Sequence, residues 1–454
     1  MRSTQKFTLS LLAAAVIAGN AHAAGFQLYA EGSSVLTGNA GAGSAAEGFD
    51  ASSSTYNPAA LVLLKHPEAV LSGVTIVPDI KFSGLVTNTT TLELFGMPVS
   101  QSVAGGPVDQ YSLAENAFVP AFHLAYPFNE QVVGAISVTA PFGLSTRYED
   151  NSNARYDATN TKVTTIDISP ALSFKVNDMV SLGIGIDFER TDVDFDSVIA
   201  FPVVDVGVFP PTVGTNDYLV KNNAKDWGIG GHGGVLFSFR EGATRIGVNY
   251  MSQVKFNLEG TSTTTGLGGP FIDTNANASL KLPNGLTGSF YHEVNKTFAL
   301  LGSVVWTKWD VLNQVQINDV ALPSGPATVI TPTNYDNVYR AALGANIRVN
   351  DHFLLRFGGA FDQSPINDVD RDLRLPDDDR WIAAVGFHVD ATSHLSFDVG
   401  YQHIFFKDPT IDLNSTVVAS PLPDVTIIQN LNARGTVDDA GADLIGIQAK
   451  WQFG

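Results

Sequence analysis

The histidines are the residues that could most readily support catalysis or metal binding. His123, His232, His388 and His403 are scattered along the chain, and no nucleophile motif surrounds any serine. Their separations also do not match the spacing of zinc ligands. Single histidines of this kind are usual on strands that form a wall. The sequence therefore predicts no enzyme, no catalytic residue and no cofactor.

An acidic segment in the last quarter of the chain offers a possible calcium loop. Asp368, Asp370, Asp372 and Asp379 have the spacing of positions 1, 3, 5 and 12 of an EF-hand loop. The sixth position, however, is Leu373 rather than glycine, and two arginines interrupt the acidic run. We interpret the segment as a solvated loop and predict no metal site.

The first 23 residues have the pattern of a secretory signal peptide. Arg2 and Lys6 precede an apolar stretch over residues 7–18, and residues 21–23 read Ala-His-Ala, a small-x-small cleavage site. The mature chain is expected to begin at Ala24. Absence of cysteine fits an exported protein.

Charge and hydropathy restrict the class of the mature chain. It keeps 45 acidic residues against fewer basic ones, so nucleic acid is not an expected partner. Beyond the signal peptide, no run of about eighteen apolar residues could form a membrane-spanning helix. Membrane insertion would therefore require strands.

Apolar and polar residues alternate with a period of two from residue 69 to the C-terminus, which predicts strands. Six tight turns are expected at residues 127–130, 176–179, 239–242, 293–296, 349–352 and 390–393. Seven long polar or Gly/Pro-rich loops are expected at residues 84–110, 147–161, 197–223, 260–274, 319–333, 362–378 and 408–440. Short and long connections alternate in this way in all-β outer-membrane barrels. The counts predict an antiparallel transmembrane β-barrel of about fourteen strands, with both termini in the periplasm.

Several strands have one apolar face that would contact lipid, with aromatic residues toward the ends. Trp227, Ile229 and Phe237 share one such face, and Trp381, Val385 and Phe387 share another. The final strand alternates up to Phe453, although Gly454 follows the aromatic residue that usually ends such barrels. A soluble all-β exported protein is the alternative.

The segment between the signal peptide and the first strand does not alternate. It is rich in Gly, Ala and Ser and ends near Tyr56-Asn57-Pro58-Ala59-Ala60, where Asn and Pro favour a turn. Composition alone leaves two interpretations open, a flexible leader or a plug inside the lumen.

Motifs spread over almost the whole mature chain resemble the FadL/TodX family of outer-membrane transporters of hydrophobic compounds. Each is weak alone, but their order and spacing are specific. They are Ala24 to Leu28, Asn57-Pro58-Ala59, Pro141 to Thr146, Arg245 to Tyr250, Trp306 to Trp309, Phe361 to Pro365 and Leu375 to Trp381.

The resemblance implies a signal peptide at 1–23, a lumenal hatch (plug) at 24–68 and a fourteen-stranded barrel at 69–454. Hatch or gate residues would be Phe26, Asn57, Pro58 and Ala59. It also implies passive uptake of long-chain fatty acids or other hydrophobic compounds, released sideways at a kinked third strand. That kink would lie at Pro141-Phe142-Gly143, where Pro lacks a ladder N–H and Gly weakens the strand. Alternatively, the strand simply ends there.

Ligand capture would need exposed apolar side chains in the long loops. The third loop carries such a run, and the fourth could face it; in the family these two loops form an outer groove. The candidate ligand-binding residues are Phe195, Val198, Ile199, Phe201, Val203, Val208, Phe209, Leu267, Phe271 and Ile272. These residues could equally pack against each other as the core of a lid.

A fatty acid would also require a basic residue to neutralise its carboxylate. Family members place basic residues near the outer end of the fifth strand, where this chain offers only Arg190. Arg190 shares strand parity with Phe188, so an interfacial role is the favoured interpretation. Neutral hydrocarbon or aromatic cargo therefore stays open.

The expected surroundings are outer-membrane lipid and lipopolysaccharide of a Gram-negative cell, with the protein acting as a monomer. The alternative functions are a porin for hydrophilic solutes and an adhesin that acts through residues 408–440.

Overall fold

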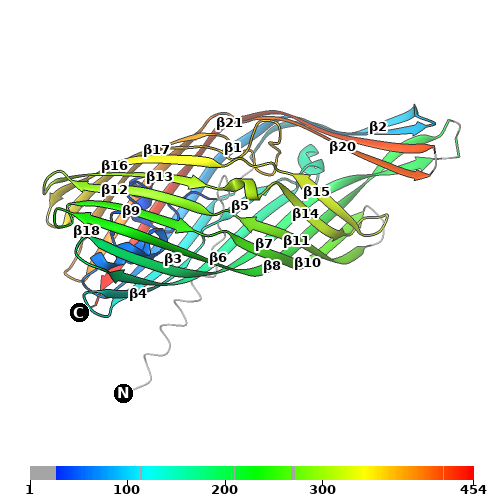
Figure 1. Ribbon diagram of the computed structural model, residues 1–454. Helices are drawn as coiled ribbons and strands as arrows, with labels where there is room; N and C mark the ends of the chain where they lie inside the picture. The colour runs from blue at the N-terminus through cyan, green and yellow to red at the C-terminus, as the bar shows by residue number, and fades with distance from the viewer. Residues whose placement is uncertain are drawn as a thin grey trace, which may run out of the picture.

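One antiparallel sheet closes on itself to form a barrel (Figure 1). The computed structural model describes residues 27–112, 115–205, 207–208, 210–266, 271–422 and 424–453. The expected signal peptide and the candidates Phe26, Phe209 and Leu267 lie outside the described residues.

The wall is a closed ring of fourteen strands, each hydrogen-bonded to the next and the last to the first. In order around the ring they are β1 (Glu68–Leu94), β3 (Ala117–Pro127), β4 (Val132–Thr139), β6 (Asn160–Lys175), β7 (Val180–Asp205), β8 (Thr212–Phe239), β9 (Thr244–Met251), β12 (Gly285–Glu293), β13 (Phe298–Thr307), β16 (Val338–Asn350), β17 (Phe353–Asp362), β18 (Arg380–Asp390), β19 (Leu395–Phe406) and β21 (Val425–Gln452). This confirms the predicted fourteen-stranded antiparallel barrel. Each strand of the ring thus has a partner on both sides, as a membrane requires.

All six predicted tight turns lie at one end of the ring, which we call the turn end. Side-chain oxygens organise most of them by accepting hydrogen bonds from the backbone two and three residues later. Asn129, Asn177, Asn295 and Thr392 each accept two such N–H groups. This is the local chemistry for which Asn is favoured in turns.

At the opposite end, the loop end, the structure corrects the predicted loops. Much of the polar sequence assigned to loops forms further strands, so that wall strands such as β1 and β7 run past the ring. The additional strands are β2 (Met97–Ser112), β5 (Gly143–Arg147), β10 (Val254–Gly266), β11 (Ile272–Leu282), β14 (Gln314–Val320), β15 (Ala327–Pro332) and β20 (Thr410–Leu422). Their Thr, Val and Ser residues alternate, and alternation with β-branched residues supports strands even where both faces are polar. The hairpins β1–β2, β7–β8 and β20–β21 project farthest in Figure 1.

Side chains of the ring strands point alternately outward and into the lumen. On β7, the outward Leu182, Ile184, Ile186 and Phe188 are exposed, whereas the inward residues between them are mostly buried. The predicted lipid-facing residues Trp227, Ile229 and Trp381 are likewise exposed, by 53%, 69% and 65%. An apolar outer surface of this kind is stable against the hydrocarbon of a bilayer.

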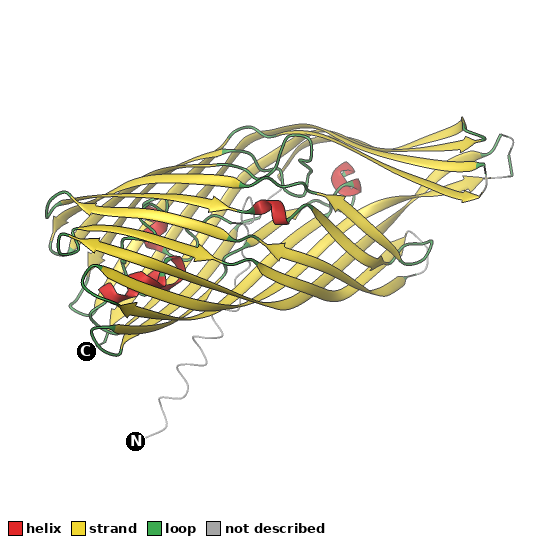
Figure 2. Ribbon diagram, viewed as in Figure 1, coloured by secondary structure: helices red, strands yellow, loops and turns green. Residues whose placement is uncertain are grey.

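The described helices are short: α2 (Ser34–Gly38), α3 (Ser53–Tyr56), η1 (Pro58–Leu63), η2 (Asn153–Tyr156) and η3 (Trp309–Val311). Among the described residues, none of the helices is long and apolar enough to cross a membrane. Figure 2 shows α2, α3 and η1 enclosed by the strands near the turn end. They belong to the segment that precedes β1.

Candidate functional site

Residues 27–66, which we call the hatch segment, cross the lumen from one wall to the opposite wall. Helix α2 packs on β18, β19 and β21, whereas η1 packs on β6, β7 and β8, about half a ring away. Nearly every side chain from residue 28 to residue 61 is buried. The segment therefore occupies the interior of the ring rather than extending from it as a leader.

The Asn57-Pro58-Ala59 motif anchors this segment to the wall. Asn57 begins η1: its Oδ1 accepts a hydrogen bond from the Ala59 N–H at 3.0 Å, and Pro58 follows as the first helical residue. The Asn57 Nδ2 atom donates to the Ala45 carbonyl at 2.7 Å and to the Val235 carbonyl of β8 at 3.2 Å. One side chain thus joins two parts of the hatch segment to the barrel.

Wall glycines allow the backbone of the hatch segment to approach the strands. A Cβ atom at Gly247 would collide with the Ala45 carbonyl oxygen, and one at Gly358 with the Asn39 carbonyl oxygen. Gly183 contacts Ala59 in the same way. Glycine within a strand weakens it, and here each of these glycines marks a close approach of another backbone.

The wall is interrupted where the sequence predicted a kink. β4 ends at Thr139 and β5 begins at Gly143, with residues 140–142 outside either strand. Both pair with β6, but β5 has no strand on its other side among the described residues, and β3 pairs with β4 only from Phe122 onward. The Thr165 side chain takes the place of a backbone partner here. Its hydroxyl accepts a hydrogen bond from the Phe142 N–H and donates one to the Phe142 carbonyl. The backbone pairing is therefore open between β3 and β5.

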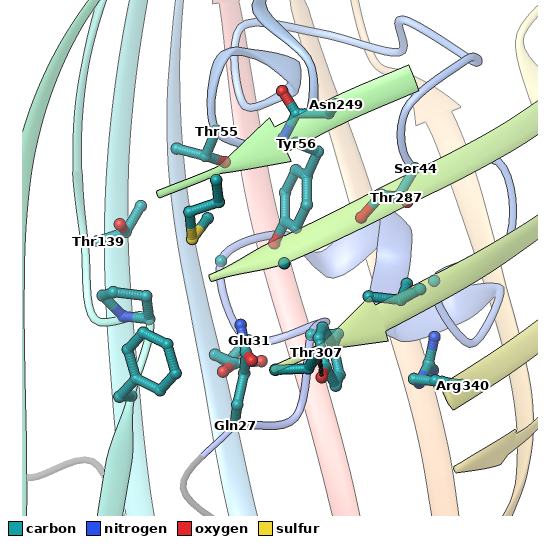
Figure 3. Close-up of a pocket in the computed structure, with 18 of the residues that line it drawn as sticks. Gln27, Glu31, Ser44, Thr55, Tyr56, Thr139, Asn249, Thr287, Thr307 and Arg340 are labelled. Atoms are coloured by element: carbon teal, nitrogen blue, oxygen red, sulfur yellow. Dashed lines mark hydrogen bonds between the residues drawn. The ribbon is translucent and has the colours of Figure 1, made fainter. Parts of the chain in front are cut away.

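A cavity of about 900 Å³, part of it open to solvent, joins the hatch segment to this interruption (Figure 3). We call it the hatch cavity. The hatch segment contributes Gln27, Tyr29 and Tyr56 to its lining. The interruption at residues 140–142, which we call the strand break, contributes Pro141 and Phe142. The rest of its lining comes from the facing wall, from residues including Asn249, Met251, Thr287, Val305, Thr307 and Arg340.

Two ionisable residues that line the hatch cavity bond to the backbone of the hatch segment. Glu31 is buried and accepts a hydrogen bond from the Leu28 N–H at 3.2 Å. Its burial raises the pKa of Glu31 to about 7. Arg340 donates to the Ala40 carbonyl at 2.8 Å and lies 3.9 Å from a carboxylate oxygen of Asp362.

A second cavity, of about 720 Å³, lies toward the loop end, and we call it the outer cavity. Its lining is almost entirely apolar and is contributed by β6, β7, β8, β10, β11 and β14. The predicted ligand residue Phe195 lines it, beside Val193 and Leu258. Such a surface suits an apolar ligand without a charged group.

The other predicted loop residues are more dispersed. Phe201 packs edge-on against Tyr218, with ring centres 6.0 Å apart. Val198 is buried, Val203 and Phe271 are exposed, and Ile272 begins β11. The structure thus places Phe195 in a cavity but does not gather the whole set around one.

Between the two cavities lies a cluster of apolar side chains within the lumen. Phe142, which lines the hatch cavity, packs edge-on against Trp309 with ring centres 6.2 Å apart. Val163, Leu258 and Leu280 belong to the same cluster and also line the outer cavity. A continuous cluster of apolar contacts therefore links the two cavities.

Arg190 is not part of either lining. It lies on the outward face of β7 with Phe188, is partly exposed, and donates to Asp192 at 2.9 and 3.1 Å. This position matches the favoured interfacial interpretation rather than contact with a lumenal ligand.

The acidic segment is not the solvated loop that we expected. Residues 363–379, which we call the strap, extend from β17 toward β5, β6 and β7 on the far side of the ring, and most of residues 371–378 are buried. Arg374 donates to Thr161 and to the Asp196 carbonyl, and its guanidinium lies 3.6 Å from the centre of the Phe195 ring. Arg371 pairs with Asp368 and Asp378. The arginines that interrupt the acidic run are thus the partners that allow it to be buried.

Sequence analysis missed the strap contacts and the glycines beneath the hatch segment. The glycines carried a usable signal, because Gly183, Gly247 and Gly358 interrupt otherwise regular strands. The strap carried a weaker one, the alternation of acidic residues with arginine.

Comparison with known proteins identifies similar chains. The family described as outer membrane protein transport protein (OMPP1/FadL/TodX) matches residues 14–453. Outer membrane protein P1 of Haemophilus influenzae is 28% identical over 99% of this chain and 100% of its own length. A long-chain fatty acid transport protein of Salmonella typhi is 26% identical over 88% of this chain and 92% of its own.

Solved structures share the fold. A Pseudomonas aeruginosa FadL homologue has a TM-score of 0.76 at 22% identity, covering 95% of this chain and all of its own. The Ralstonia pickettii toluene transporter TbuX has a TM-score of 0.62 at 17% identity, covering 93% and 99%.

Proposed function

Since the chain belongs to the OMPP1/FadL/TodX family of outer-membrane transport proteins, we propose that it takes up long-chain fatty acids or other hydrophobic compounds by passive diffusion through a lateral path. Ligand would be captured at the outer cavity, pass along the apolar cluster around Phe142, and reach the hatch cavity. From there it would leave sideways between β3 and β5, at Pro141-Phe142-Gly143. The relatives are transporters rather than enzymes, and the protein is located in the outer membrane.

One observation carries this proposal: the hatch cavity is lined both by the hatch segment and by the strand break. A ligand held there touches the element that blocks the axial route and the interruption that offers a lateral one. The alternative, an axial route for hydrophilic solutes, would have to displace Asn57, Ala59 and Ala60, which are wholly buried.

We also propose which molecules surround the barrel in the membrane. Outward Leu, Ile and Trp side chains would contact membrane lipid and, at the loop end, lipopolysaccharide. The ring closes within one chain, and we propose that this single barrel acts as a monomer.

Uptake by cells that lack their own hydrophobic transporters tests the function. Cells that produce the protein should accumulate a radiolabelled long-chain fatty acid or fatty alcohol faster than empty-vector cells, without a change in sugar uptake. A matched variant, Phe142→Asp, should reduce this gain, because a charge would enter the apolar cluster beside Trp309. Gain of sugar uptake alone would contradict the proposal.

The hatch function has a separate test. Deleting residues 24–58 while keeping the signal peptide should leave an inserted barrel that conducts ions and small solutes in planar bilayers. A deletion variant that inserts and conducts no more than the full chain would show that the hatch segment is not the seal.

A further inference from the structure

A third cavity, of about 450 Å³, adjoins the strand break, and we call it the exit cavity. It shares Thr55, Thr139, Pro141 and Phe142 with the hatch cavity. The exit cavity therefore lies beside the proposed path from the hatch cavity to the gap between β3 and β5.

Three carboxylates from neighbouring strands converge on the exit cavity. Asp167 of β6 and Asp187 and Glu189 of β7 line it, and their exposed fractions are 6%, 7% and 3%. Asp187 has partners: the Ser169 hydroxyl donates to it at 2.8 Å, and Nδ1 of His232 lies 2.7 Å away. The other ring nitrogen of His232 lies 3.0 Å from the Ser54 carbonyl of the hatch segment.

Asp167 and Glu189 are not satisfied in the same way. One oxygen of each, Oδ1 of Asp167 and Oε1 of Glu189, is buried without a hydrogen-bond partner. A buried acceptor of this kind costs free energy unless a ligand or water donates to it. Among the described lining residues there is no lysine or arginine that could neutralise an incoming anion.

Another part of the lining is apolar. It is contributed by Phe142, Met251, Val254, Leu282 and Pro283, which line the same small space as the carboxylates. A ligand that fits this lining has an apolar body and a hydrogen-bond donor, and it has no negative charge.

From this arrangement we propose that Asp167 and Glu189 determine specificity at the lateral exit. Their unpartnered oxygens accept a hydrogen bond from the hydroxyl group of an uncharged hydrophobic alcohol. This acidic and largely desolvated lining disfavours the carboxylate of an ionised fatty acid, because an added negative charge would be buried there without a lysine or arginine partner among the described lining residues. This inference rests on the proposed lateral route and names the cargo that the route favours.

The test compares two cargoes of equal chain length in the same cells. Initial rates of accumulation of radiolabelled hexadecanol and palmitate are measured at pH 8, where dissolved palmitate is an anion, for the full chain and for Asp167→Asn/Glu189→Gln. We expect the double variant to raise the palmitate rate by about tenfold and to change the hexadecanol rate by less than about threefold. Comparing each cargo only with itself removes differences in later metabolism.

Asp192→Asn is the matched control, because Asp192 lies on the outward face of β7, paired with Arg190. It should leave both rates unchanged. Folding of each variant barrel is checked by the change in its electrophoretic mobility on heating. If the double variant does not fold, the single variants Asp167→Asn and Glu189→Gln are measured in its place.

The outcomes separate the two hypotheses. If the full chain takes up hexadecanol but the folded acid-to-amide variants leave the palmitate rate unchanged, the specificity role is overturned and transport stands. If the full chain takes up neither cargo above the empty-vector rate, the proposed function is overturned, and the specificity role with it.

Discussion

The hatch segment and the strap both lie across the barrel, yet they are held by opposite means. At the turn end, the hatch segment rests on strand glycines such as Gly247 and Gly358, where its backbone fills the space that a side chain would take. Toward the loop end, the strap is held by the long side chains of Arg371 and Arg374, buried among carbonyl and carboxylate groups.

This difference determines how each segment can be released. Adding a single carbon to the wall should displace the hatch segment, whereas removing a single side chain should release the strap. Loss of a buried charge partner is expected to cost more than overpacking by one methyl group, so the strap should be the more sensitive of the two segments.

Arg374→Met should have the largest effect. The variant removes the positive charge that lies near the buried Asp157 and the partly buried Asp372, at a cost of about 3–5 kcal/mol. The strap should then become accessible to protease added outside cells, with ion conductance still low because the hatch segment is intact.

Its control is Arg434→Met, which breaks the exposed ion pair with Asp412 and should cost no more than about 1 kcal/mol. Equal protease resistance of the Arg374→Met variant and the unaltered chain would show that the arginine does not hold the strap.

Gly247→Ala comes next, with an expected cost of about 1–3 kcal/mol to docking of the hatch segment. The new methyl group meets the Ala45 carbonyl, so single-channel recordings should show more frequent openings. Gly288→Ala on the adjacent strand β12 has open space at its Cβ position and should behave as the unaltered chain. Equal opening frequencies for the Gly247→Ala and Gly288→Ala variants would contradict the role of Gly247 in docking the hatch segment.

Glu31 gives the smallest effect, a dependence of hatch docking on pH. Its pKa is about 7 when docked, whereas an undocked, hydrated glutamate ionises at its ordinary, lower pKa. The docked state therefore binds the proton more tightly. Docking weakens as the pH rises, and this weakening levels off above about pH 7. Between pH 6 and pH 8 the loss should be about 1 kcal/mol.

Opening frequency recorded across this pH range is the measurement. Glu31→Gln should remove the rise that the unaltered chain shows. An unchanged pH profile in this variant would assign the dependence to another group.

Local chemistry made the barrel predictable from sequence. Alternation gave the strands, and Asn at positions such as 129 and 177 gave the turns, because a side chain that bonds its own turn needs no distant partner. The break at Pro141 was equally local, since it follows from a missing N–H and a glycine.

The candidate site was less predictable because its contacts join distant parts of the chain. Arg374 bonds to Thr161, more than two hundred residues earlier, so a segment that is buried in the fold looked solvated in sequence. In the sequence, Asp167 is a single polar residue on an alternating strand. Only the fold shows that Glu189 of β7 lines the same cavity. Conversely, Arg190 had a suitable charge, but strand parity turned it outward.

Photoaffinity labelling tests the lateral path most directly. A fatty alcohol carrying a diazirine is supplied to cells that produce the protein, irradiated, and the labelled peptides are identified by mass spectrometry. The account predicts label on Thr139, Pro141, Phe142 and Met251, which line both cavities beside the break. Label at the turn-end residues Arg348 and His352, with none at residues 139–142, would show that cargo leaves through the periplasmic mouth and would contradict lateral release.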